Sequence, residues 1–416
     1  MKNWEIKIEN QRMSKKPKKI RILLTGGGTG GHVYPLISVG LELRKSLMNQ
    51  FIESDIRYFG DPGNFKFYLD SNDIKISKIV SSKWRRYLSI KNFFDVFKFL
   101  WSLFQSFWKI YLFMPDICFS KGGPGSLSVT YVCRFYFIPI VIHESDAVPG
   151  LANRLSARKA RLVELAFESS KDYLKTAAEI NLVGNPVRQE VLRAESLTDV
   201  EYEFGFSPKE PVILFIGGSQ GASKLNEFVF ENLQKLIESF QVLHQVGWNN
   251  FPEYKREFDF LYKDASSYLR SRYYFVPYFE KNIGSAYQGA DIVVARAGAN
   301  SIFELAALGK PSILIPLPES ANNHQIENAY QYERKGAALV IEEENLLGSL
   351  LINEVNKLLT DKDRYELMSQ AARNFYIPDT AQKIAQDVLK IIGIEIQTQA
   401  QAPKFTREEI RGSDEK

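Results

Sequence analysis

Two glycine-rich turns, far apart in the chain, constrain its fold more than any other feature of the sequence. The apolar pattern of residues 20–25 runs into a turn at 26–31, and that of residues 212–216 runs into a second turn at 217–222. Glycine lets the backbone take a positive φ there and lets a phosphate approach without meeting a Cβ atom. The helix that follows such a turn offers unpaired N–H groups and a partial positive charge. Two turns of this kind predict two α/β units with a ligand cleft between them.

The spacing of the other apolar segments predicts that each half is a doubly wound α/β domain. Strand patterns at 20–25, 55–59, 76–80, 117–120, 138–143 and 162–166 alternate with helical patterns, and a second series follows at 212–216, 240–246, 273–276, 292–295, 312–316 and 338–341. This alternation favours parallel sheets covered on both faces. We predict a disordered basic leader (1–18), an N-terminal Rossmann-like domain (19–186), a linker (187–210), a C-terminal Rossmann-like domain (211–377), a C-terminal helix (378–395) and a disordered tail (396–416).

Composition narrows the chemistry that the chain can carry. Its 416 residues suit two domains, its net charge is +4, and its only cysteines are Cys118 and Cys133, so no disulfide framework or thiolate metal site is expected. The four histidines lack ligand spacing, and we predict neither a metal nor another cofactor. The basic residues 2–21 are followed by no secretory apolar stretch, which predicts a cytoplasmic protein. Nucleic acid is not a predicted partner, because aromatic and basic residues do not alternate on candidate strands.

Three further motifs give the first turn a specific meaning. Alone, the G-x-G-x-x-G spacing of residues 26–31 also fits a dinucleotide-dependent oxidoreductase, with Asp61 as its ribose-binding acid. The chain also contains Gly184-Asn-Pro-Val-Arg188, Gly217-Gly-Ser-Gln-Gly-Ala222 and Arg296-Ala-Gly-Ala-Asn-Ser-Ile-Phe-Glu304. With Leu24-Thr-Gly-Gly-Gly-Thr-Gly-Gly-His-Val-Tyr-Pro35, these motifs resemble in order and spacing the MurG family, the N-acetylglucosaminyltransferases that convert lipid I to lipid II in peptidoglycan synthesis. The resemblance covers about residues 20 to 393.

The resemblance implies a GT-B fold, in which two Rossmann-like domains face a cleft. It implies an inverting transferase that moves N-acetylglucosamine from UDP-N-acetylglucosamine to the muramoyl 4-hydroxyl of lipid I, at the cytoplasmic face of the cell membrane. A GT-B transferase acting on another membrane glycolipid, such as diacylglycerol, remains an alternative, because Pro124 stands where many members carry Tyr. The oxidoreductase and a non-catalytic membrane module are alternatives of other classes, but they leave the second turn or the cleft unexplained.

On the acceptor side, two residues are candidates for the general base. His32 precedes an apolar helix and belongs to the family motif, and an imidazole can accept the proton of the attacking hydroxyl. Asp146, in the segment His143-Glu-Ser-Asp146, is a donor-sugar contact or an alternative base, and equally an N-cap for a helix near 151–160. Thr29, Gly30 and Gly31 are donor-binding candidates, expected to bind the donor sugar or the acceptor diphosphate through backbone N–H groups.

On the donor side, charges and amides follow the second set of motifs. Arg188 could offset the charge that develops on the UDP leaving group. Glu304 is placed to accept hydrogen bonds from both ribose hydroxyls, and Phe279 is a weaker candidate for packing against uracil. Further donor-binding candidates are Ser219, Ala299, Asn300 and Ser301 for phosphate, and Gln325 and Asn328, by the resemblance, for the sugar hydroxyls.

The stretch from Trp84 to Phe113 is predicted to contact a membrane. Its polar residues recur at three- and four-residue steps, which makes one narrow polar stripe on an otherwise aromatic and aliphatic helix. The charged stripe argues against a transmembrane span, and packing in the domain core is the alternative. An apolar arc this broad, with basic residues nearby, favours partial insertion at an anionic surface. The residues assigned to the membrane are Trp84, Phe94, Phe97, Trp101, Phe104 and Trp108.

Overall fold

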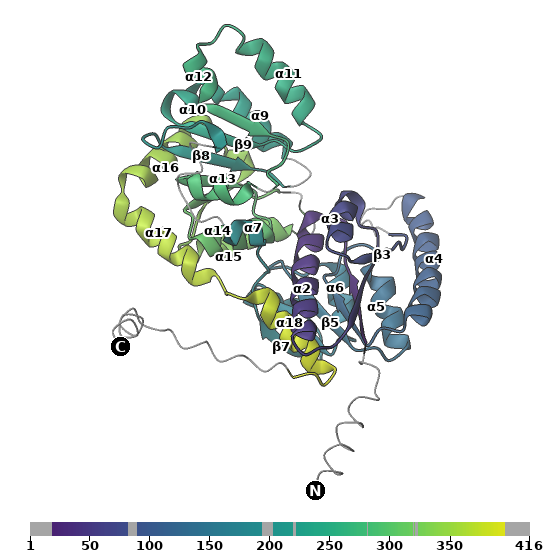
Figure 1. The fold of residues 1–416 in the computed structure, drawn as a ribbon. Helices are drawn as coiled ribbons and strands as arrows, with labels where there is room; N and C mark the ends of the chain where they lie inside the picture. The colour runs from purple at the N-terminus through teal and green to yellow at the C-terminus, as the bar shows by residue number, and fades with distance from the viewer. Residues whose placement is uncertain are drawn as a thin grey trace, which may run out of the picture.

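The computed structural model describes residues 19–81, 90–193, 203–218, 222–280, 282–318, 320 and 323–395, with side chains from residue 95 onward in the helix that begins at 90. These residues form two lobes, each built on one parallel sheet covered by helices (Figure 1). In the described residues the first sheet has seven strands in the order β3-β2-β1-β4-β5-β6-β7, and the second has six in the order β10-β9-β8-β11-β12-β13. In both sheets the order reverses beside the strand that leads into a glycine-rich turn.

All paired strands run parallel, so their carboxyl ends share one edge of each sheet. Strands of the first sheet are β1 (Ile20–Thr25), β2 (Ser54–Phe59), β3 (Lys75–Ser77), β4 (Ile117–Ser120), β5 (Ile140–Glu144), β6 (Leu162–Leu165) and β7 (Glu179–Leu182). Strands of the second are β8 (Val212–Ile216), β9 (Gln241–Gln245), β10 (Tyr273–Val276), β11 (Ile292–Ala295), β12 (Ser312–Leu314) and β13 (Leu339–Val340). The central strands β4 and β8 are buried along their whole length, as expected for strands covered on both faces.

Helices cover both faces of each sheet. Those of the first lobe are α2 (Gly30–Met48), α3 (Lys66–Ser71), α4 (Ile90–Phe113), α5 (Ser126–Phe135) and α6 (Leu151–Ala157). They are followed by α7 (Gln189–Leu192), α9 (Ser223–Glu231), α10 (Leu233–Ser239), α11 (Phe251–Leu261), α12 (Ser267–Ser271), α13 (Ile283–Gly289), α14 (Ala299–Leu308), α15 (His324–Glu333), α16 (Gly348–Thr360), α17 (Lys362–Phe375) and α18 (Thr380–Ile391). The last helix returns from the second lobe to pack against α2 of the first (Figure 1). The apolar residues of α18 therefore belong to the core of the first lobe.

The predicted alternation of strands and helices is confirmed, with two departures. Strand β7 was not expected, because its four residues are half-exposed or exposed at the edge of the sheet and carry no run of apolar side chains. Helix α2 begins at Gly30, before His32, which was expected to precede the helix, because the turn enters the helix directly. His32 therefore lies in the first helical turn. The domain boundaries given above stay predictions.

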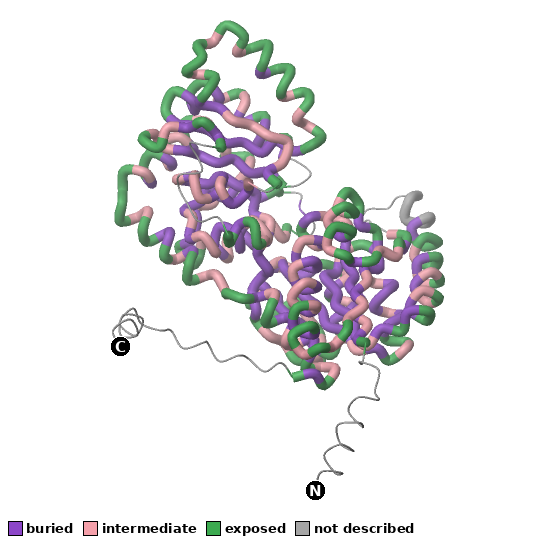
Figure 2. Tube along the Cα trace, in the orientation of Figure 1, coloured by how far each residue is buried: buried purple, intermediate pink, exposed green. Residues whose placement is uncertain are grey.

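Helix α4 turns most of its polar stripe inward, with Lys98 exposed, and turns its large apolar side chains outward over much of its length. Ser102 and Ser106 are buried, and the Oγ atoms of Ser106 and Ser128 of α5 are 3.4 Å apart. Gln105 accepts a hydrogen bond from the Val80 N–H at 3.0 Å. By contrast, Trp101 is 54% exposed, and exposed residues follow the outer side of α4 from residue 96 onward (Figure 2). The exposed side chains of this arc are therefore not core residues, whereas Ile110 and Phe113 of the same helix do pack in the core.

Candidate active site

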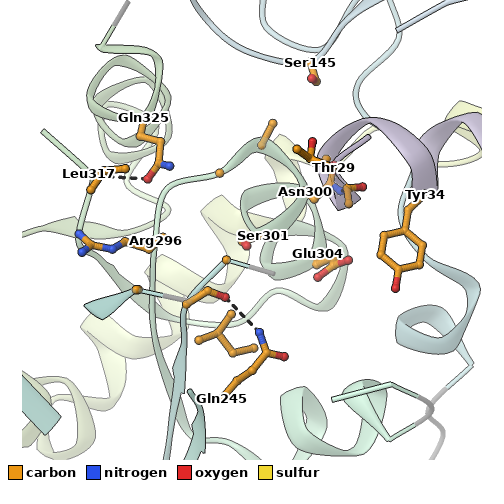
Figure 3. Close-up of a pocket in the computed structure, with 18 of the residues that line it drawn as sticks. Thr29, Tyr34, Ser145, Gln245, Arg296, Asn300, Ser301, Glu304, Leu317 and Gln325 are labelled. Carbon is orange, nitrogen blue, oxygen red and sulfur yellow. Dashed lines mark hydrogen bonds between the residues drawn. The ribbon is translucent and has the colours of Figure 1, made fainter. Parts of the chain in front are cut away.

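A cleft of about 690 Å³ lies between the two lobes, at the carboxyl ends of both sheets. Figure 3 shows Thr29 and Asn300, from different lobes, next to each other at this cleft. Eleven of the predicted site residues line it: Thr29, Gly30, Gly31, His32, Asp146, Arg188, Ala299, Asn300, Ser301, Glu304 and Gln325. The sequence motifs thus converge on one site. Ser219 lies outside the described residues, as does Trp84, and the side chain of Phe94 is likewise not described.

His32 is held in one orientation by its neighbour in the turn. Its Nδ1 lies 2.8 Å from the hydroxyl Oγ1 of Thr29, and its Nε2 faces the loop after β4. A Cβ atom at Gly123, whose φ is +84°, would come within 3.0 Å of that Nε2 and 2.9 Å of the Gly27 nitrogen, so glycine is required there. Burial, followed by the positive charge of Lys121, lowers the pKa of His32 to about 4. The imidazole is therefore neutral and able to accept a proton near pH 7.

Asp146 bridges the two walls of the cleft. Its Oδ1 accepts a hydrogen bond of 2.9 Å from the amide of Asn328 in the second lobe. The carboxylate of Glu144 accepts hydrogen bonds from the backbone N–H groups of Asp146 and Gly150. These bonds fix the conformation of the loop between β5 and α6. Burial, then the charge of Asp146, raises the pKa of Glu144 to about 7. The N-cap of α6 is Gly150, so the prediction that Asp146 caps this helix is wrong.

The N-terminus of α14 forms the facing wall of the cleft. Gly298 is its N-cap residue, and the N–H groups of Ala299, Asn300 and Ser301 belong to its first turn, where they have no acceptor within the helix. The side chain of Asn300 spans the lobes, donating to the Gly30 carbonyl at 3.3 Å and accepting from the Asn185 amide at 2.8 Å. Helix α14 is thus fixed opposite the first turn, with its positive end toward the cleft.

Arg188 and Glu304 form a two-point ion pair in this wall. The guanidinium donates from Nε to Oε1 at 2.6 Å and from Nη2 to Oε2 at 2.9 Å, and both side chains are largely buried. The hydroxyl of Tyr287 also donates to Glu304, at 3.1 Å. Nη1 of Arg188 donates to the hydroxyl of Tyr278, which lies 3.4 Å from that of Tyr34 across the cleft. Both carboxylate oxygens of Glu304 are engaged, so a ribose must compete with Arg188 for them.

Two predicted donor residues do not line the cleft. The side chain of Phe279 is fully buried in the core of the second lobe, so it is not placed to pack against uracil. The amide of Asn328 is also buried, and it bonds Asp146, the N–H of Ala147 at 2.7 Å and the carbonyl of Ala297 at 3.2 Å. Asn328 therefore ties the lobes together, and its prediction as a sugar ligand finds no support in this position. Gln325 does line the cleft, with its Oε1 held by the Leu317 N–H at 3.2 Å (Figure 3).

Several residues at the cleft were missed in the sequence. Gln245 ends β9 and accepts from the N–H of Phe279 at 3.0 Å while donating to the carbonyl of Gly217 at 3.1 Å. It therefore orders the second glycine-rich turn. Tyr278 follows β10, and Tyr34 lies in the first helix. The rule that ligands bind beyond the carboxyl ends of parallel strands could have identified Gln245 and Tyr278.

Two facing parallel sheets with one cleft define a GT-B protein, and solved structures agree. The chain aligns with the crystal structure of Acinetobacter baumannii MurG at a TM-score of 0.67 and 26% identity, covering 89% of this chain and 99% of that one. A UDP-GlcNAc 2-epimerase from Neisseria meningitidis aligns at a TM-score of 0.62 with 16% identity, covering 89% of this chain and 100% of that one. The second likeness shows the fold alone, because one fold hosts several chemistries.

Sequence comparison identifies the family. Residues 22–164 match the glycosyltransferase family 28 N-terminal domain, and residues 212–388 match its C-terminal domain. UDP-N-acetylglucosamine–N-acetylmuramyl-(pentapeptide) pyrophosphoryl-undecaprenol N-acetylglucosamine transferases of Clostridium botulinum and Legionella pneumophila are each 35% identical over 83% of this chain, covering 92% and 90% of their own lengths. The chain belongs to the MurG family of family 28 glycosyltransferases. The GT-B prediction is confirmed.

Proposed function

We propose that the protein transfers N-acetylglucosamine, with inversion, from UDP-N-acetylglucosamine to the muramoyl 4-hydroxyl of lipid I and so forms lipid II. The observation that carries this proposal is the cleft, which is lined by the neutral imidazole of His32 from one lobe and by the N-terminus of α14 from the other. One wall supplies a proton acceptor, and the other supplies N–H groups for a diphosphate.

Proton removal is assigned to His32. Its Nδ1 lies 2.8 Å from the Thr29 hydroxyl, and in the tautomer with the proton on Nδ1 the lone pair of Nε2 is available as the base. That nitrogen takes the proton as the acceptor oxygen attacks the anomeric carbon from the face opposite UDP. Asp146 is the alternative base, and its bond to Asn328 sets its carboxylate at the junction of the lobes.

Stabilisation of the UDP leaving group is assigned to the second lobe. As the bond between the sugar and UDP breaks, negative charge grows on the diphosphate, and the N–H groups at the start of α14 are aimed at it. Glu304 binds the ribose hydroxyls. Because Arg188 now holds both oxygens of Glu304, its guanidinium becomes available to the diphosphate when ribose takes its place.

The experiment that tests this function compares acceptors with one labelled donor. Purified protein is incubated with radiolabelled UDP-N-acetylglucosamine and lipid I, diacylglycerol or no acceptor. Label in lipid II, with UDP released in equal amount, supports the proposal. Transfer to diacylglycerol alone overturns the acceptor assignment, and isomerisation of the donor sugar without an acceptor overturns glycosyl transfer altogether.

We further propose that the outer face of α4 docks the protein on an anionic membrane. Among the described residues, no helix combines the length and the apolar character required to cross a bilayer. An apolar arc on a helix whose polar residues face the domain is exposed to water at a free-energy cost of about 25 cal/mol per Å². Insertion of this arc into the headgroup region removes that cost.

The docking face extends beyond α4. Phe135, the last residue of α5, and Phe137 just after it are 63% and 83% exposed, and the ring centroids of Phe107 and Phe135 lie 5.6 Å apart. Exposed large side chains of α4 in this face are Val96, Phe97, Leu100, Trp101, Phe104, Trp108, Tyr111 and Leu112. Lys98 and Arg134 are exposed on the same two helices and would meet anionic headgroups. A patch of this size is characteristic of an interaction surface.

A further inference from the structure

A lysine buried beneath the first glycine-rich turn has no part in the mechanism above. Lys121 directly follows β4 and is 2% exposed. Its Nζ lies 2.6 Å from Nδ1 of His143 and 3.2 Å from Oδ1 of Asn185. A buried ammonium is costly unless it is paired and hydrogen-bonded, so a site that keeps one calls for an explanation.

The hydrogen bonds of Lys121 have a defined direction. Nε2 of His143 lies 2.8 Å from the carbonyl of Gly184, which can only accept, so Nε2 carries the proton. Burial, then the charge of Lys121, lowers the pKa of His143 well below its usual value and keeps the ring neutral. The Nδ1 lone pair therefore accepts from the ammonium. Lys121 donates to both neighbours.

These bonds begin a relay of amides that crosses the cleft. Asn185 accepts from Lys121 and donates to the Oδ1 of Asn300 at 2.8 Å, and Asn300 donates to the carbonyl of Gly30 at 3.3 Å. The relay joins the end of β4, the segment between the lobes, the first turn of α14 and the first glycine-rich turn. It ties the proton-accepting wall to the phosphate-binding wall.

Lys121 is also close to the candidate base. A Cβ atom placed on Gly26 would lie 3.4 Å from Cβ of Lys121 and 3.5 Å from Cβ of His32, so the two side chains leave the backbone on either side of one glycine. We propose that Lys121 is a positioning residue for glycosyl transfer, whose buried ammonium orients the interdomain amide relay and places a positive charge beneath His32 and Asp146.

The charges around Lys121 and His32 show how Lys121 acts on the pKa of His32. Lys121 faces His143, Glu144 and Asp146, and burial lowers its pKa to about 7 while the two carboxylates oppose that fall. At the lower pH where His32 titrates, Lys121 is therefore protonated. His32 itself faces Lys121, Asp146 and His324, and Lys121 lowers its pKa whereas Asp146 raises it.

The inference rests on the proposed transfer, and its test uses Lys121→Gln, which keeps hydrogen-bonding capacity but removes the charge. Without the ammonium, protonation of His32 becomes easier, so the acid limb of kcat/KM moves up by about one pH unit. Lys121→Met, which also breaks the relay, should show the same shift and a further fall in kcat of about 10- to 100-fold. The matched control is Lys310→Met, which removes a partly buried lysine that donates to the carbonyls of Gln288 and Ala290 and should leave the limb in place.

A readout independent of transfer completes the test. In isotope-labelled protein, NMR should show His32 of the wild type titrating well below 6.5, and its pKa should rise in Lys121→Gln. An ordinary pKa for His32 in the wild type overturns the proposal even if neither variant folds. An unmoved acid limb together with an unmoved His32 pKa in Lys121→Gln also overturns it. Wild-type protein that transfers nothing to lipid I removes the proposed function but leaves the NMR result standing.

Discussion

The two lobes share one topology but present different chemistry to the cleft. The first lobe faces it with His32, and buries Glu144 behind Asp146; burial shifts the pKa of both groups. The second faces it with a helix N-terminus and with a carboxylate already neutralised by Arg188. From this difference we infer that the first lobe carries out proton transfer and the second lobe binds the donor. The variants below test that division.

The largest effect is expected for His32→Ala. Loss of the general base should lower kcat by about 10²–10⁴ with little change in donor affinity, because the imidazole belongs to the wall that does not bind UDP. Steady-state kinetics with lipid I and calorimetry with UDP measure the two quantities. Thr29→Val, which removes only the hydroxyl that orients Nδ1, should give a smaller loss in the same direction. A fall in kcat of less than tenfold for His32→Ala would move the role of base to Asp146.

The next effect concerns the outer surface of the first lobe, remote from its wall of the cleft. Replacing Trp101 and Trp108 with Ser should weaken binding to anionic vesicles by about 2–4 kcal/mol, since each ring forfeits apolar area worth about 25 cal/mol per Å². Vesicle sedimentation measures the loss, and activity on a short-chain soluble acceptor should survive.

A matched control lies in the second lobe. Trp248 is 56% exposed, and Trp248→Ser should leave vesicle binding unchanged. If the double variant instead unfolds or loses soluble activity while each folded molecule still binds vesicles, the rings support the fold and the docking face is wrong.

Sequence patterns predicted the parts of the molecule that depend on local order. The glycine-rich turns and the strands ending in them follow from short-range patterns, and eleven of the predicted site residues do line the cleft. What failed depends on contacts between distant segments. Asn328 bonds Asp146, 182 residues earlier in the chain, which no local pattern encodes. In α4, by contrast, the periodicity indicated an outward apolar arc, which the exposure of Trp101 and Trp108 fits, but it did not distinguish the residues Ile110 and Phe113 that pack in the core.

Donor binding should respond to Glu304→Gln more than catalysis does. The amide keeps the size of the side chain but removes the charge that holds Arg188 and would accept from ribose, so UDP affinity should fall by about 1–3 kcal/mol. Calorimetry with UDP measures this loss. Alanine is the poorer choice, because it strands a largely buried guanidinium and destabilises the lobe itself. Unchanged UDP affinity in a folded Glu304→Gln would remove the ribose assignment and place the ion pair among the structural contacts.

The smallest effect is expected where the two lobes meet, at Asn328→Ala. Its amide bonds Asp146 and Ala147 of the first lobe and Ala297 of the second, so the variant should loosen their alignment and lower kcat about two- to tenfold, as removal of hydrogen bonds worth about 0.5–1.5 kcal/mol each implies. The KM for UDP-N-acetylglucosamine should barely change, because the buried amide does not reach the cleft. Gln331→Ala, which breaks only a bond to Glu327 within the same helix, is the control and should leave both constants unchanged. A rise in the donor KM with kcat preserved would mean that Asn328 leaves Asp146 and binds the sugar. The division between proton transfer in one lobe and donor binding in the other would then not hold at the contact between the lobes.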